Sequence, residues 1–201
     1  MDYKKSRDYA WRVLAKCKIS SLPVNVGEIC RKEHVRLVTY REGAELIERL
    51  QLGGHTIGND AFSLKRLIFY DDTKPVTRQR FSVAHELGHG LLHSPSGATV
   101  YNREMSSNDD PLESEANVFA SRLLAPLCVL HELNVQSAKE IADLCRISMI
   151  AAEIRFERLQ TVRERDRLFR RTRGYGCFLM SADERRVFKR FEEYIREHRK
   201  H

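Results

Sequence analysis

The stretch RFSVAHELGHGLLH, residues 80–93, places His85 and His89 four positions apart and Glu86 directly after the first histidine. In an α-helix, positions i and i+4 differ by about 40° around the axis, so the two imidazoles project from one face and can bind one metal ion. Glu86 is displaced around the axis, where it can reach a water at the metal rather than the metal itself. The spacing therefore predicts the site of a metal-dependent hydrolase.

The surrounding sequence predicts a largely buried helix from about Thr77 to Leu92, entered through Pro75. Two histidines and a glutamate in such a helix cost stability unless they are paired or bind a metal. Gly88 and Gly90 support the same view, because a glycine inside a helix costs about 1 kcal/mol relative to alanine. We expect these glycines to allow the close approach of another backbone or of a substrate.

A third ligand must come from elsewhere, because a catalytic zinc ion usually has three protein ligands and a water. The segment LESEANVFASRLLAP, residues 112–126, predicts a helix that ends near Pro126 and offers Glu113 and Glu115. These two are about 200° apart on a helix and cannot both face the metal. We predict Glu115, because it shares a face with Phe119, and we assign Glu113 to the helix dipole of the first turn.

Two further residues near the pattern are candidates for other roles. His93 lies on the face of His85 and His89, but two turns from His85, so we expect it to interact with free carbonyls at the helix C-terminus. Tyr101 lies in the polar stretch 94–111, which is long for a connection and typical of a lid or binding loop. It is a candidate to stabilise an oxyanion, although a tyrosine there is more often simple loop packing.

Short β-like runs at 35–40, around 54–58 and at 66–71 precede the helix, with a helical candidate at 43–50. They predict an α+β fold: a small sheet packed on the HExxH helix and partner helices, followed by a helical C-terminal part. A substrate peptide could pair along the edge of this sheet, and the run 66–71 is the best candidate for that edge.

The C-terminal part combines a two-helix unit with positive charge. Residues 137–160 predict two helices with a break at 146–148, an arrangement that resembles a helix-turn-helix. The net charge of +7 comes from residues 146–201, which hold 16 basic and 9 acidic side chains. This excess could meet an acidic partner or nucleic acid. However, the second helix offers only Arg155 and Arg158 among apolar or acidic residues, so direct DNA recognition is not the favoured interpretation.

The cysteines and the apolar runs of the sequence indicate the cellular compartment. The five cysteines are scattered and never form CxxC, which argues against a disulfide framework and a structural zinc site. No signal peptide is recognisable, and no apolar run is long enough to span a membrane. We expect a cytoplasmic protein.

The HELGH pattern followed by EANVFASRLLAP, residues 115–126, resembles the ImmA/IrrE-type metallopeptidase family, in which an HExxH helix precedes an E-A-N-x-F-A helix ending in L-L-x-P. The resemblance covers roughly residues 23–160. Ala125 stands where the family often has methionine, and we see no consequence for the chemistry.

The resemblance implies a zinc-dependent, gluzincin-like endopeptidase with His85, His89 and Glu115 as ligands and Glu86 as catalytic base. Two histidines and a carboxylate also accept manganese or another divalent ion. The family implies site-specific cleavage of a protein, typically a helix-turn-helix repressor, which relieves repression in a mobile element or stress response.

This interpretation divides the chain into a metallopeptidase domain, 1–130, and a helical region, 131–201, which contains the helix-turn-helix-like part and a basic tail, 161–201. The last segment, 181–198, has one apolar face that suits docking onto the body or self-association. The alternative function is a non-catalytic metal-binding or DNA-binding regulatory module that acts through this C-terminal region.

Overall fold

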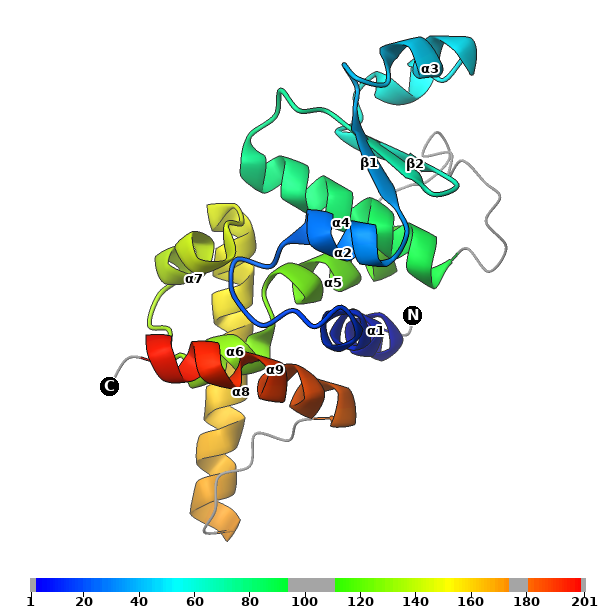
Figure 1. The fold of residues 1–201 in the computed structure, drawn as a ribbon. Coiled ribbons are helices and arrows are strands. Elements are labelled where there is room, and N and C mark those ends of the chain that lie inside the picture. Colours follow the sequence, from blue (N-terminus) through cyan, green and yellow to red (C-terminus); the bar gives the residue numbers. More distant parts are fainter. Residues whose placement is uncertain (1–2, 94–110, 174–180, 200–201) are drawn as a thin grey trace. The chain divides into compact units, whose positions relative to one another are not determined.

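The computed structural model describes residues 3–93, 111–173 and 181–199 of the chain (Figure 1). Tyr101, the candidate for oxyanion stabilisation, lies outside the described residues. None of the helices in the described ranges is long and apolar enough to cross a membrane.

The contacts divide the chain into two compact units. The first comprises residues 1–10 and 25–124, and the second comprises residues 11–24 and 125–201. The expected domain boundary at residue 130 stays a prediction.

The first unit holds the sheet and the helices that carry the predicted site. The elements up to residue 124 are α1 (Tyr3–Lys16), α2 (Val26–Lys32), β1 (Arg36–Thr39), α3 (Ala44–Arg49), the short 3-10 helix η1 (Gly53–Thr56), β2 (Ala61–Leu64), β3 (Leu67–Tyr70), α4 (Val76–Leu92) and α5 (Pro111–Leu124).

The three strands form one mixed sheet in the order β1–β3–β2, in which β3 pairs parallel with β1 and antiparallel with β2. Phe62 and Phe69 lie directly opposite each other on β2 and β3, and their ring centroids are 4.9 Å apart. With Val38 and Ile47 they belong to one buried cluster, which joins the sheet to α3. Helix α4 packs against β2 and β3. The predicted α+β class, with a small sheet on the HExxH helix, is confirmed.

Two expectations about the strands are wrong. The run around 54–58 is not a strand, because η1 occupies Gly53–Thr56 and β2 follows at Ala61–Leu64. Glycine-rich residues offer few side chains to a core, whereas β2 supplies Phe62. Moreover, β3 is the central strand rather than an edge, since Ile68 and Phe69 are both buried and each side of β3 is paired.

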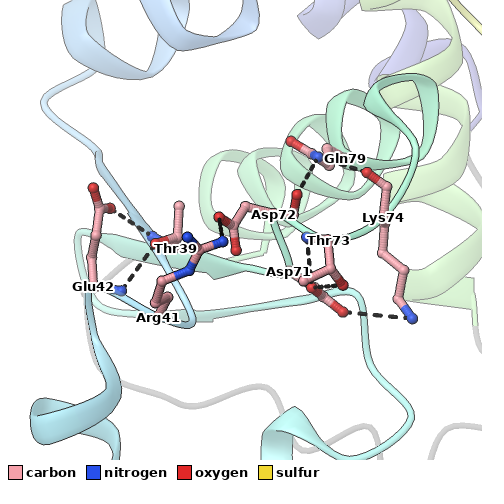
Figure 2. Close-up of polar contacts among 8 residues, drawn as sticks. All are labelled: Thr39, Arg41, Glu42, Asp71, Asp72, Thr73, Lys74 and Gln79. Atoms are coloured by element: carbon pink, nitrogen blue, oxygen red, sulfur yellow. Dashed lines mark hydrogen bonds and ion pairs between the residues drawn. The ribbon is translucent and has the colours of Figure 1, made fainter.

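The connection from β3 to α4 is held by side-chain hydrogen bonds (Figure 2). Thr73 donates from its backbone N–H and its hydroxyl to Oδ1 of Asp71, at 2.9 and 2.6 Å. These bonds hold the pKa of the Asp71 carboxyl below its usual range. Gln79 donates from Nε2 to the carbonyls of Asp72 and Lys74, at 3.0 and 2.7 Å. Because Gln79 belongs to the first turn of α4, the bonds tie the start of the HExxH helix to the end of the sheet.

The second unit is helical. It contains the helices α6 (Leu127–Glu132), α7 (Ala138–Cys145), α8 (Met149–Arg173) and α9 (Ala182–His198).

Helices α7 and α8 form the predicted two-helix unit. The Ser137 side chain caps α7 by accepting from the Glu140 N–H at 3.2 Å. Arg146 then ends the helix in the left-handed conformation, with φ of 49°. Helices commonly end with a single residue in this conformation, which turns the chain away from the helix axis. Helix α8 can therefore begin three residues later. The apolar face of α9 buries Val187, Phe191 and Ile195, and α9 packs against α6 within the same unit.

Candidate metal centre

Helix α4 brings the predicted site residues into a buried environment. His85, Glu86 and His89 are 3%, 4% and 2% exposed, and every residue from 83 to 89 is buried. The burial follows from packing, because α4 contacts strands β2 and β3 as well as helices α2 and α5. Three polar side chains at this depth require strong partners.

Helix α5 supplies partners to the two histidines, and Gly88 lets it come close. Gly88 faces Phe119 and the backbone of Ala116, both on α5. Gly90 differs, because nothing the structure describes lies within 4 Å of the place where its Cβ would be. The expected close approach of another backbone is therefore found at Gly88.

The carboxylate beside the two histidines belongs to Glu113. Nε2 of His85 lies 3.1 Å from Oε2 of Glu113, and Nε2 of His89 lies 3.1 Å from Oε1. The two Nε2 atoms are 3.0 Å apart. Hydrogen bonds from His85 and His89 hold the pKa of the Glu113 carboxyl well below its usual range, so Glu113 is ionised at neutral pH.

These three side chains fit a divalent metal ion. In the described part of the chain, their ligand atoms form the one group of histidine, cysteine and carboxylate atoms that lie within 4.8 Å of one another. Two imidazoles at about 2.0–2.1 Å from a tetrahedral ion hold their nitrogens roughly 3.3 Å apart, close to the spacing observed. Two buried imidazole nitrogens that face each other and a carboxylate need a proton or a cation between them, and two histidines with one glutamate are a known catalytic zinc set.

Glu115, which the sequence argument chose as third ligand, does not lie with His85 and His89. Its Oε2 contacts Nε2 of His93 at 3.1 Å. His93 in turn brings its Nδ1 to 3.3 Å from Nδ1 of His89. His93 therefore has side-chain contacts with Glu115 and His89, beyond the helix-end role expected for it.

Asn117 is a site residue to which the sequence argument gave no role. Its Oδ1 lies 2.9 Å from Nδ1 of His85. A signal for both Asn117 and Glu113 exists in the sequence, since they are four residues apart on α5 and so share a face. That spacing repeats the spacing of His85 and His89 on α4, and the two pairs meet.

Glu86, the predicted base, is buried and is not part of the ligand cluster. It follows His85 and is displaced from it by about 100° around the helix, so it does not share the ligand face. This position is compatible with acting on a molecule bound at the site.

Of the two arginines that the second helix could offer to DNA, one is buried in the structure. Arg155 is 2% exposed and donates from its guanidinium to the carbonyl of Ala125, so it is not available to a phosphate. The exposed side chains near the start of α8 include Ile150 and Ile154, which are 71% and 61% exposed. An apolar surface of this kind does not suit the major groove.

Comparisons with known proteins support a peptidase. Residues 43–157 match the peptidase family M78, described as the IrrE N-terminal-like domain, and this range is more than half of the chain. The matched range contains α4, α5 and the α7–α8 turn. No curated protein and no solved structure matches the chain.

Proposed function

This chain belongs to the IrrE N-terminal-like peptidase family M78, and on that premise we propose that it is a zinc-dependent endopeptidase of the HExxH type. Its substrate would be a regulatory protein, in particular a helix-turn-helix transcriptional repressor. The observation that carries the proposal is the convergence of His85 and His89 from α4 with Glu113 from α5.

We assign the metal to His85, His89 and Glu113, with Glu113 in the place first given to Glu115. All three offer an atom to one point in space, and the chemistry is that of a catalytic zinc ion. When bound, zinc would supply a Lewis acid that polarises a peptide carbonyl and makes water more acidic.

Glu86 is the residue we assign to proton transfer. Its carboxylate would accept a proton from the attacking water and pass it to the leaving amine of the cleaved peptide. Burial of Glu86 at 4% exposure keeps bulk water from competing for that proton.

Strand β2 is the place we propose for an extended substrate segment. In the described part of the chain β2 pairs only with β3, so its other side is an edge, and α4 packs against it. A peptide could add to this edge by main-chain hydrogen bonds, with specificity coming from alternate side chains.

A cytoplasmic setting agrees with the thiols. The described cysteines, Cys17, Cys30, Cys128 and Cys145, are buried thiols that form no disulfide with one another. Thiols stay reduced in a reducing compartment such as the cytoplasm. The proposed substrate, a transcriptional repressor, would be present in the same compartment.

The decisive experiment compares the zinc-loaded wild type with Glu86→Gln on a panel of purified helix-turn-helix repressors and on casein. We expect one discrete cut in one repressor, found by intact mass, and none in casein. Glu86→Gln should keep about one zinc per chain and lose cleavage by roughly 10²-fold or more. Full cleavage by Glu86→Gln with zinc bound would refute the base assignment, and a wild type with zinc that cuts no repressor would refute the substrate class.

A further inference from the structure

We infer that His93 and Glu115 position His89 for metal binding, by fixing which of its ring nitrogens carries the proton. The inference rests on the proposed metal site, and it gives a role to the two residues that the ligand set does not use. His93 and Glu115 would act on the metal only through His89, because neither belongs to the ligand cluster. They are therefore positioning residues.

The three side chains form a continuous chain of contacts. Nδ1 of His89 lies 3.3 Å from Nδ1 of His93, and Nε2 of His93 lies 3.1 Å from Oε2 of Glu115. The side chain of His93 is 6% exposed and that of Glu115 is 18% exposed. Contacts this sheltered are weakly screened by water, so they can decide a tautomer.

The order of donors and acceptors follows from the carboxylate end. An ionised Glu115 can only accept, so Nε2 of His93 must donate to it. In a neutral His93 the other nitrogen, Nδ1, is then an acceptor, and Nδ1 of His89 must be the donor. With Nδ1 protonated, the neutral form of His89 has its lone pair on Nε2, the atom that faces Glu113 and His85. A bound metal would take the place of the proton through which Nε2 contacts Glu113 in the metal-free chain. A metal needs that nitrogen unprotonated.

His85 has a simpler partner of the same kind. Its Nδ1 lies beside Oδ1 of Asn117, an amide oxygen that can only accept. Both candidate ligand histidines thus have an acceptor at Nδ1, which leaves Nε2 as the nitrogen for the metal. For His85 the acceptor at Nδ1 is a neutral amide. For His89 the acceptor is the histidine His93, whose own tautomer depends on Glu115.

The test measures zinc affinity by competition with a chromophoric chelator, on chains first stripped of metal. His93→Phe keeps a ring but removes the acceptor, and we expect it to weaken zinc binding by about 10–100-fold. His93→Asn puts Oδ1 at the position of Nδ1 and should recover most of that loss. Urea unfolding of each stripped variant separates a loss of affinity from a loss of fold.

The link through Glu115 is tested by a double variant. Glu115→Leu should weaken zinc binding in the wild-type background and add little in the His93→Phe background, since both changes interrupt one path. A matched control is His131→Phe in the second unit, where His131 also lies 3.1 Å from a glutamate, Glu132. This control should leave zinc affinity unchanged.

Three outcomes would overturn the inference. Unchanged affinity in His93→Phe would remove the positioning role, and equal losses in His93→Asn and His93→Phe would mean that an acceptor at the place of Nδ1 is not what His93 provides. Abolished zinc binding in Glu115→Leu, together with a changed absorption spectrum of the cobalt-substituted chain, would make Glu115 a direct ligand. A wild type that binds no zinc would instead refute the proposed function, which keeps the two failures distinct.

Discussion

A Cβ atom placed on Gly88 would lie 2.9 Å from Cδ1 of Phe119 and 3.4 Å from Cα of Ala116. Real Cβ atoms essentially never approach another heavy atom as closely as the first of these distances. Gly88 therefore sets how near α5 can come to α4. Since His85 and His89 are on α4 and Glu113 is on α5, the same contact sets the distance across which the proposed ligands meet.

Gly88→Ala should therefore destabilise the protein and weaken zinc binding. Phe119 is fully buried and has little room to retreat, so overpacking should cost about 1–3 kcal/mol. This cost exceeds the gain of up to about 1 kcal/mol from the better helix propensity of alanine. Urea unfolding and chelator competition measure the two effects.

Gly90→Ala is the matched control, because there the added Cβ meets no described atom within 4 Å. It should raise the free energy of unfolding by roughly 0.5–1 kcal/mol. Equal effects of the two substitutions would show that close packing at Gly88 is not what the glycine provides.

Metal content should separate the two glutamates of α5. We expect about one zinc per chain in the wild type, little in Glu113→Ala and His89→Ala, and a substantial fraction in Glu115→Ala, because only Glu113 lies beside both histidines. Elemental mass spectrometry on protein prepared without chelator makes the measurement. Retention of metal by Glu113→Ala and its loss by Glu115→Ala would restore the assignment made from sequence.

The part of the site that lies on one helix could be predicted from sequence, and the part between helices could not. The convergence of His85 and His89 follows from the 3.6-residue period, which is a local property of the chain, whereas the role of Glu86 stays a prediction. The choice between Glu113 and Glu115 depends on how α5 crosses α4. Glu113 reaches the two candidate ligand histidines and Glu115 reaches His93, so the helix period alone could not tell which of the two glutamates lies beside the metal site.

The sheet shows the same limit. The apolar run of β3 identified a strand. Its central place depends on pairing not only with β2, the strand just before it, but also with β1, which lies far back in the chain. Strand β2 was missed because its four residues, Ala61–Leu64, carry a weak pattern by themselves. What makes them a strand is tertiary, namely the stacking of Phe62 on Phe69.

Arg155 and Arg158 should differ in any binding to DNA. Arg158 is exposed, whereas Arg155 is buried against the Ala125 carbonyl. If the basic C-terminal part contacts phosphates, Arg158→Gln should reduce the salt slope of binding by about one unit, and Arg155→Gln should leave that slope unchanged. Fluorescence anisotropy on one duplex at several salt concentrations makes the comparison. A reduced slope in Arg155→Gln alone would contradict the structural role of this arginine.

Cys128 should make the protein less stable at alkaline pH. Burial raises the pKa of the Cys128 thiol far above its usual range, whereas in the unfolded chain a thiol titrates near about 8.5. The folded state thus holds its proton after the unfolded state has lost it. The contribution of Cys128 to stability is complete below about pH 8.5 and falls as pH rises above it, by up to about 1.4 kcal/mol per pH unit.

Urea unfolding of the wild type and of Cys128→Ala between pH 7.5 and 10 tests this sign. The wild type should lose more stability than the variant as pH rises, even if the variant begins lower because a buried sulfur has been removed. Iodoacetamide labelling followed by peptide mapping is an independent measurement, since a buried protonated thiol reacts slowly until the chain unfolds. Parallel pH profiles in the two proteins, or rapid labelling of Cys128 in the native state, would mean that this thiol ionises while the second unit is folded.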